Sequence, residues 1–257
     1  MVKVKFIRYA TMIIEYGNKR FLVDPMLRAK GQTEEVSVLQ YPQKPPLMDL
    51  PMPAEEIVKD IDAVLMTHIH PGHFDNRAGS LLSKTLPFYV QNLNDKDQAR
   101  DFGMKKTQTI DMTLSSHLDD VYIIRVAGRH GDGKPMHIIN TMQNSSGILL
   151  EKEGEQTVYI TGDTMWCMGV EQGLAANPGL IIAYLGANKG EGMQLTMGLK
   201  ELEQLVSKAP RAKILACHMD TFENQTLSRS EVRAWAEQKG LTDRILVPEN
   251  GEELTFE

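Results

Sequence analysis

Residues 67–75, THIHPGHFD, follow directly on an apolar run that is typical of a buried strand. They place three histidines, His68, His70 and His73, close together in the chain. Residues two apart at a strand end point to the same side, so His68 and His70 can hold one metal ion together. The turn formed by Pro71 and Gly72 lets His73 face a neighbouring position, where a second ion would sit. The stretch therefore predicts a metal centre at the end of a strand.

The composition restricts the classes of partner. The chain has 257 residues, 28 basic and 34 acidic side chains and a net charge of −6. This balance lacks the basic footprint of nucleic-acid binders, so we expect no nucleic-acid partner. We expect a small-molecule substrate instead. An anionic substrate would need locally placed positive charge, which a metal ion could supply.

The location of the protein can be inferred from its cysteines and its apolar runs. Cys167 and Cys217 are far apart in the chain and fit buried free thiols in a reducing compartment. The strand-like start, MVKVKFIRYA, lacks the continuous apolar core of a signal peptide. No apolar run approaches the ~20 residues that a membrane-spanning helix needs. We therefore expect a cytoplasmic protein without a membrane partner; the sequence does not indicate an oligomeric state.

The order of the expected elements predicts one layered α/β (α+β) domain over residues 1–257. Residues 3–24 are typical of an antiparallel meander, and residues 28–53, with five prolines, predict a long surface loop that forms part of the pocket wall. Helices and strands then alternate, apart from a mostly β middle at 107–161. The expected helices are 53–61, 76–85, 95–103, 169–176, 198–207 and 229–239. Such a succession indicates layers of sheet and helix, and we see no linker between separate domains.

Four further candidates follow apolar strands, where sites assemble in layered sheets: Asp24, His130, Asp163 and His218. His130 would complete three nitrogens around the first ion. Asp163 would bridge both ions, and His218 would join His73 on the second, so we expect Asp163 and His218 to be the catalytic residues. Imidazole and carboxylate ligands suit zinc or manganese, with iron as an alternative.

Five motifs in this order resemble the metallo-β-lactamase-fold metallo-hydrolases over nearly the whole chain. They are FLVDP with Asp24, THIHPGHFD, GRHG with His130, YITGDT with Asp163, and ACHMD with His218. PPLMDLP, QLTM and RILVPENGEELTF are similar to the branch that includes L-ascorbate-6-phosphate lactonase. The resemblance implies a four-layer αβ/βα sandwich and hydrolysis of an ester-like bond in a lactone, thioester, amide or phosphoester. A bound divalent ion lowers the pKa of water to about 7, which makes hydroxide available at neutral pH.

Gly72 departs from the family pattern, which has an aspartate bound to the second metal at this position. The second ion would keep His73, His218 and a share of Asp163. We therefore expect a filled first site and a partly filled or empty second one, with activity either reduced or retuned. Asp75 is not expected to compensate, because it precedes a helical run and fits an N-cap.

Several alternatives stay open. His137 competes with His130 for the third nitrogen, and Asp132 and Glu191 are looser candidates for a substitute ligand. Asp24 is expected to accept a hydrogen bond from a metal-bound histidine or a nearby backbone group rather than to bind metal. A catalytically impaired, metal-stabilised protein that binds a ligand is the alternative to a hydrolase. A mononuclear iron oxygenase is a third reading.

Overall fold

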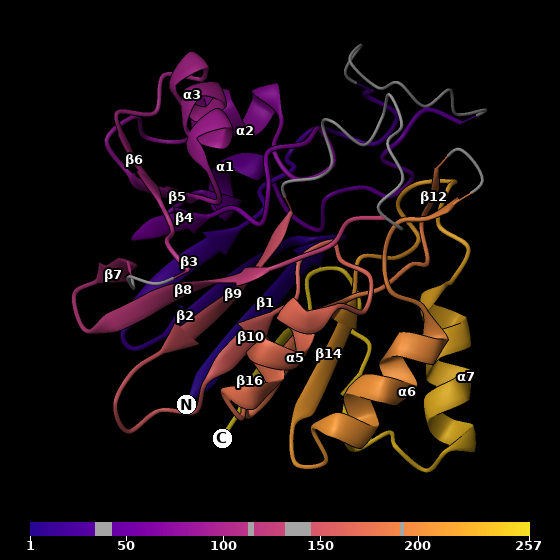
Figure 1. Ribbon diagram of the computed structural model, residues 1–257. Coiled ribbons are helices and arrows are strands. Elements are labelled where there is room, and N and C mark those ends of the chain that lie inside the picture. The colour runs from indigo at the N-terminus through magenta and orange to yellow at the C-terminus, as the bar shows by residue number, and fades with distance from the viewer. Residues whose placement is uncertain (34–42, 113–115, 132–144, 191–192) are drawn as a thin grey trace.

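The computed structural model describes residues 1–33, 43–112, 116–131, 145–190 and 193–257. These residues form two seven-stranded mixed sheets that pack face to face, with helices on the outer face of each sheet (Figure 1). The expected four-layer αβ/βα sandwich is confirmed.

The first sheet has the strand order β16-β1-β2-β3-β4-β5-β6. Its strands are β1 (Val2–Arg8), β2 (Thr11–Tyr16), β3 (Lys19–Val23), β4 (Ala63–Leu65), β5 (Pro87–Val90), β6 (Lys106–Thr109) and β16 (Glu253–Phe256). The expected meander forms β1 to β3, and Gly17 and Asn18 turn the chain between β2 and β3 with φ of 58° and 61°. Tight hairpin turns need positive φ at both central residues, which these two residue types tolerate. From β3 to β6 the neighbouring strands are parallel.

The second sheet has the order β15-β14-β11-β10-β9-β8-β7. Its strands are β7 (Ser116–Leu118), β8 (Val121–Ala127), β9 (Ser146–Glu151), β10 (Val158–Ile160), β11 (Leu180–Tyr184), β14 (Lys213–Cys217) and β15 (Ile245–Leu246). Strands β10, β11, β14 and β15 are parallel neighbours, and their apolar side chains are almost all buried. A short ribbon, β12 (Lys189–Gly190) with β13 (Met193–Gln194), lies outside both sheets.

Three apolar clusters hold the layers together. The largest lies between the sheets and joins, for example, Leu65 of β4 to Ile160 of β10. The second packs α5 (Met168–Ala175), α6 (Leu199–Lys208) and α7 (Arg229–Gln238) on the second sheet. The third packs α1 (Ala54–Ile57), α2 (Asn76–Leu81) and α3 (Leu93–Asp101) on the first sheet. Each sheet is therefore covered on both faces.

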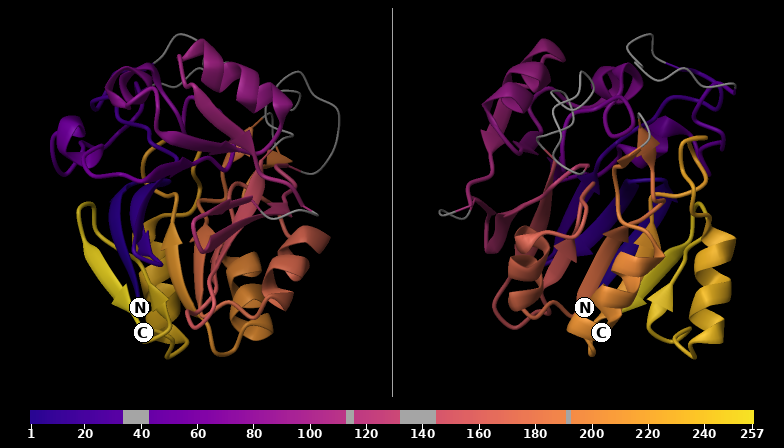
Figure 2. Two further views of the ribbon diagram at one scale, coloured as in Figure 1. Left: turned by 90° about the vertical axis from the view of Figure 1, so that its left-hand side faces the viewer. Right: turned by 45° about the vertical axis from the view of Figure 1, so that its right-hand side comes forward.

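Three further observations concern the expected loop, the two ends of the sequence and the helices. The described parts of the expected loop, residues 28–33 and 43–53, contain no helix or strand. Val2 of β1 pairs with Phe256 of β16, so the two ends of the sequence lie side by side (Figure 2). Within the described residues, no helix has both the length and the apolar character needed to cross a membrane.

Candidate metal centre

The predicted site residues gather where strands of both sheets end. Asp24 follows β3 and His68 lies three residues beyond β4 in the first sheet, while Asp163 follows β10 and His218 follows β14 in the second. Parallel strands deliver their carboxyl ends to the same edge, which brings these residues together although they lie far apart in the chain. His218 adopts a φ of 71°, a left-handed conformation that turns the chain sharply at the end of β14.

Two groups of side chains offer ligand atoms for a metal ion. His68, His130 and Asp163 form the first group; His73, Asp163 and His218 form the second. Within each group the candidate ligand atoms lie within 4.8 Å of one another, and all five residues are buried. Asp163 belongs to both groups, which is the geometry that the sequence predicted for a bridging carboxylate.

The imidazole nitrogens of three histidines face the Asp163 carboxylate. Asp163 Oδ1 lies 2.8 Å from His218 Nε2, and Oδ2 lies 3.4 Å from His73 Nε2 and 3.6 Å from His130 Nε2. The two nitrogens of the second group, His73 Nε2 and His218 Nε2, are 3.3 Å apart.

The hydrogen bonds on the far side of each ring assign the tautomers. Nδ1 of His218 lies 3.0 Å from the Leu185 carbonyl, and Nδ1 of His130 lies 2.9 Å from the Leu195 carbonyl. A carbonyl only accepts, so both Nδ1 atoms carry the proton and a neutral ring leaves a lone pair on Nε2. His73 donates from Nδ1 to a carboxylate in the same way.

The Nε2 atoms of three histidines therefore point at one carboxylate, an arrangement that a cation would stabilise. His68 Nε2 and Asp163 Oδ1 are buried without a hydrogen-bond partner among the described residues. Unpaired buried polar atoms are costly, and a metal ion would satisfy both. The two groups fit a divalent transition metal, because they offer imidazole nitrogens and a carboxylate, are buried, and contain these unpaired atoms.

Asp24 connects the histidine loop to the rest of the site. Its Oδ2 accepts a hydrogen bond from His73 Nδ1 at 2.9 Å, from Thr67 Oγ1 at 2.7 Å and from the Tyr184 hydroxyl at 3.0 Å. Its Oδ1 accepts from the Thr67 backbone N–H at 2.8 Å. Asp24 thus lies behind the ring of His73, in the place that orients an imidazole ligand.

The charges of the site act on the protonation of its members. Burial, followed by the charge of His73, lowers the pKa of His68 well below its usual value. Burial would also lower the pKa of His73, but the carboxylates of Asp163 and Asp24 outweigh it and raise that pKa to about 10. Burial opposes ionisation of Asp163, yet His218 and His73 keep the pKa of its carboxyl well below the usual range. A proton and a metal ion therefore compete for the same nitrogens, and metal binding is expected to release protons.

His70 belongs to neither group. Its ring is stacked on that of His68 with the centroids 5.7 Å apart, and its Nδ1 accepts a hydrogen bond from the Gly72 backbone N–H at 3.2 Å. Burial, followed by the charge of His73, lowers the pKa of His70 to about 3. His70 is thus a neutral neighbour of the first group here, and its role as a ligand stays a prediction.

Asp75 caps a helix, as the sequence predicted. Its Oδ1 accepts a hydrogen bond from Ala78 N–H at the start of α2, and its Oδ2 accepts from Arg28 N–H at 2.7 Å. Both oxygens are engaged, so Asp75 does not take the place of the family aspartate. The other candidates for that role, Asp132 and Glu191, and the competing His137 lie outside the described residues.

Sequence reasoning missed three side chains that shape the site: Thr67, Tyr184 and Tyr9. Thr67 and Tyr184 both donate to Asp24, and Tyr9 packs its ring on His218. The adjacency of Thr67 to the first histidine was a usable signal. Tyr9 lies at the turn between β1 and β2, and nothing in its local sequence points to the site.

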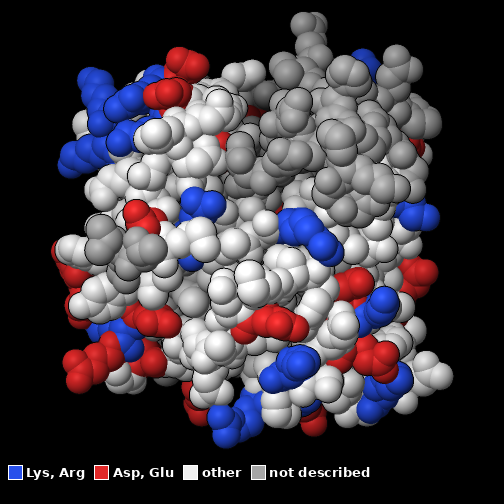
Figure 3. All heavy atoms as spheres, viewed as in Figure 1, with Lys and Arg blue, Asp and Glu red and all other residues white. Residues whose placement is uncertain are grey.

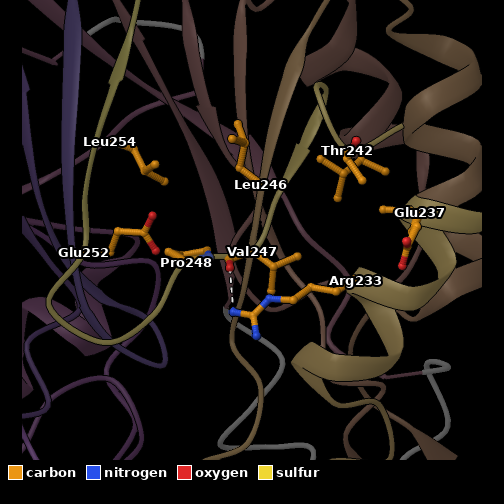
Figure 4. A pocket seen from close by; sticks show the side chains of 10 residues that line it. Arg233, Glu237, Thr242, Leu246, Val247, Pro248, Glu252 and Leu254 are labelled. Atoms are coloured by element: carbon orange, nitrogen blue, oxygen red, sulfur yellow. Dashed lines mark hydrogen bonds between the residues drawn. The ribbon is translucent and has the colours of Figure 1, made fainter. Parts of the chain in front are cut away.

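A separate pocket lies where β15 and β16, the edge strands of the two sheets, meet α7 (Figure 4). It encloses about 510 Å³ and is lined by apolar residues such as Leu246 and Leu254 and by charged residues such as Arg233 and Glu252. No residue of either metal-ligand group lines it. On the part of the face in Figure 3 that is not grey, basic and acidic side chains are interspersed among uncharged ones.

The fold and the two ligand groups define a metal-dependent hydrolase built as a metallo-β-lactamase-type sandwich. The family model of the beta-lactamase superfamily domain matches residues 19–219. The chain belongs to this superfamily and, within it, to the UPF0173 family of metal-dependent hydrolases.

Three relatives illustrate this membership. The UPF0173 protein YddR of Bacillus subtilis is 33% identical over 97% of this chain and 98% of its own. The crystal structure of a possible metal-dependent hydrolase from Veillonella parvula has a TM-score of 0.93 and 30% identity, and the match covers 100% of both chains. The isothiocyanate hydrolase from Delia radicum gut bacteria has a TM-score of 0.92 and 28% identity, with 99% of both chains covered.

Proposed function

We propose that the protein hydrolyses an ester-like bond of a small molecule at a centre dominated by one metal position. The observation that carries the proposal is the convergence of three imidazole Nε2 atoms on the Asp163 carboxylate, beside the unpaired Nε2 of His68. His68, His130 and Asp163 would hold the first ion, with His70 stacked alongside. Zinc or manganese suits this set of nitrogen and oxygen donors, and iron is the alternative.

The chain's own residues would prepare the site for hydrolysis. When bound, a divalent ion supplies an acidified water molecule and draws electron density from the group under attack. The Leu195 and Leu185 carbonyls hold the rings of His130 and His218 with Nε2 facing inward. Asp24 does the same for His73. The ligands would thus be oriented before any substrate arrives, which reduces the cost of reorganisation during the reaction.

The second group is proposed to be the weaker of the two positions. Gly72 offers no carboxylate, so an ion there would keep His73 and His218 and share Asp163 with the first ion. Removing one of two negative charges beside a second cation lowers affinity, because repulsion between the ions is then less well compensated. An altered pocket around Gly72 is the other consequence that we expect.

Two classes of substrate follow from different observations. The similarity of PPLMDLP, QLTM and RILVPENGEELTF to the lactonase branch favours a lactone or another ester, and a thioester or phosphoester has the same kind of electrophilic centre. The likeness to the isothiocyanate hydrolase, at 28% identity over nearly the whole chain, favours an isothiocyanate, whose central carbon is also open to attack by water. We propose a cytoplasmic site of action, and an anionic substrate would be attracted by the metal ion.

The experiment combines metal analysis with a substrate panel. Purified protein is loaded with zinc or manganese, dialysed, analysed by mass spectrometry, and offered lactones, thioesters, phosphoesters and isothiocyanates. We expect close to one tightly held equivalent per chain and hydrolysis that is lost in His130→Ala. His117→Ala removes an exposed histidine away from both groups and serves as the matched control. Two equally tight equivalents would contradict the unequal positions, and a loaded protein inactive on the whole panel would favour a ligand-binding role.

A further inference from the structure

The surroundings of Gly72 are packed with aromatic rings. A Cβ atom added at Gly72 would lie 3.3 Å from His70 Nδ1 and 3.5 Å from both Tyr9 Cε1 and Phe222 Cζ. Gly72 is not among the glycines with positive φ, so its backbone does not itself require glycine. A single Cβ fits there with small adjustments, but the carboxylate of a longer side chain would have to extend past these rings.

Tyr9 covers the second ligand group on this side. Its ring is stacked on that of His218, with 3.8 Å between the centroids and 27° between the planes, and its edge faces His73 at 5.6 Å. The ring of Phe222 also packs against that of Tyr9, with 4.9 Å between the centroids and 57° between the planes. The side chain of Tyr9 is almost completely buried, so it has little room to move aside.

A second, independent contact joins Tyr9 to His218. The Tyr9 carbonyl accepts a hydrogen bond from the His218 backbone N–H at 3.0 Å. Both residues have left-handed backbone conformations, with φ of 63° for Tyr9 and 71° for His218. Such conformations are unfavourable for residues with a side chain and persist only where the surrounding structure enforces them. The two residues therefore form one rigid unit.

We propose that Tyr9 is a positioning residue that limits the second group to three protein ligands. The ring holds His218 in place and occupies the space through which a carboxylate at position 72 would reach the ion. An aromatic ring also supplies no negative charge to a cation. The low capacity of the second group is then a joint property of positions 9 and 72. This inference rests on the proposed function, because it concerns the same metal centre.

The test is a double-mutant cycle read as metal affinity. The proteins are the wild type, Gly72→Asp, Tyr9→Ala and the double variant, and the affinity for each zinc equivalent is measured by competition with a chromophoric chelator. We expect Gly72→Asp alone to bind the second equivalent within about threefold of the wild type. In the Tyr9→Ala background the same substitution should tighten the second equivalent by at least about tenfold, the non-additivity expected of residues in contact.

Each outcome decides the inference. A tighter second equivalent in Gly72→Asp alone overturns it, as does the lack of any gain in the double variant. If Tyr9→Ala does not fold, Phe222→Leu replaces it in the cycle. This substitution removes the other aromatic ring beside position 72, and combined with Gly72→Asp it is expected to tighten the second zinc equivalent by the same factor. Tyr122→Ala, which removes a half-exposed tyrosine, controls for the loss of a tyrosine and should change neither affinity. If the wild type binds no zinc at either position, the proposed function itself is contradicted. If all variants bind the first zinc equivalent as the wild type does, any change in the second equivalent can be assigned to positions 9 and 72.

Discussion

Asp24 lies 49 residues before His73 in the chain, yet its Oδ2 accepts a hydrogen bond from the Nδ1 of that ring at 2.9 Å. The contact is completely buried and joins the end of β3 to the histidine loop. It fixes which nitrogen of His73 faces the second group.

Replacing Asp24 with asparagine should weaken metal binding without disturbing the backbone. Asp24 has a φ of 42°, and asparagine tolerates this left-handed region. We expect a loss of about 10- to 100-fold in metal affinity, as is typical for partners of ligating histidines, measured by chelator competition. Tyr184→Phe removes only one donor to Asp24 and should have a smaller effect. Equal affinities in Asp24→Asn and the wild type would show that Asp24 does not orient His73.

Removal of metal should lower thermal stability. An ion that binds only the folded state stabilises it by about 2.7 kcal/mol at 100 times the dissociation constant. For a chain of this size we expect chelation to lower Tm by roughly 5–10 °C, measured by calorimetry before and after dialysis against a chelator. His68→Ala, which removes a ligand of the first group, should have a Tm that hardly responds to the chelator. An identical Tm with and without metal would count against a resident ion.

Asp75→Ala should affect stability and leave metal content unchanged. The substitution removes the cap of α2 and the acceptor for Arg28 N–H, and loss of an N-cap costs about 1 kcal/mol. Urea unfolding measures the cost. Ser228→Ala on α7 is the matched control, because Ser228 caps that helix far from the histidine loop. A variant that loses a metal equivalent would instead place Asp75 among the ligands.

Asp95 should make stability depend on pH in a defined window. Burial raises the pKa of its carboxyl from 3.8 to about 6 in the folded protein, while the unfolded chain retains the lower value. Between these values the folded state binds more protons at Asp95, so the contribution of this group to stability is fully present below pH 3.8 and is lost as pH rises through about 6. The difference corresponds to on the order of 2–3 kcal/mol.

The measurement for Asp95 is urea unfolding between pH 4 and 7. Asp95→Asn removes the titrating group, so we expect the variant to gain stability relative to the wild type as pH rises through this range. Asp97→Asn, on the exposed face of the same helix, is the control and should run parallel to the wild type. Parallel curves for Asp95→Asn would show that the carboxyl does not titrate differently in the folded state.

Much of the fold follows from local patterns. The meander at the start was predictable because its strands are short and rich in β-branched and aromatic residues. A Gly-Asn turn joins the second strand to the third. The buried parallel strands were predictable because they are continuous apolar runs. β6 (Lys106–Thr109) was not predicted individually, because its residues KTQT alternate only weakly and it gains stability from pairing with β5.

The candidate site was predictable where a ligand follows an apolar strand. His130, Asp163 and His218 share this position, and the structure brings them together. The position of His70 outside both groups could not be foreseen, since residues two apart face the same side only in an extended backbone. The chain turns after His70, and the Gly72 backbone N–H donates a hydrogen bond to His70 Nδ1. The stacking of Tyr9 on His218 depends on tertiary packing between the two sheets, which no local pattern encodes.

The pairing of β1 with β16 has a consequence for synthesis of the chain. β1 has one hydrogen-bonding edge whose partner, β16, is made much later than β1 itself. Until then that edge is open to pairing with other chains. Pairing between such distant segments also slows folding, because a long loop must close first. Linking β16 directly to β1 and opening the chain elsewhere would let these two strands emerge together.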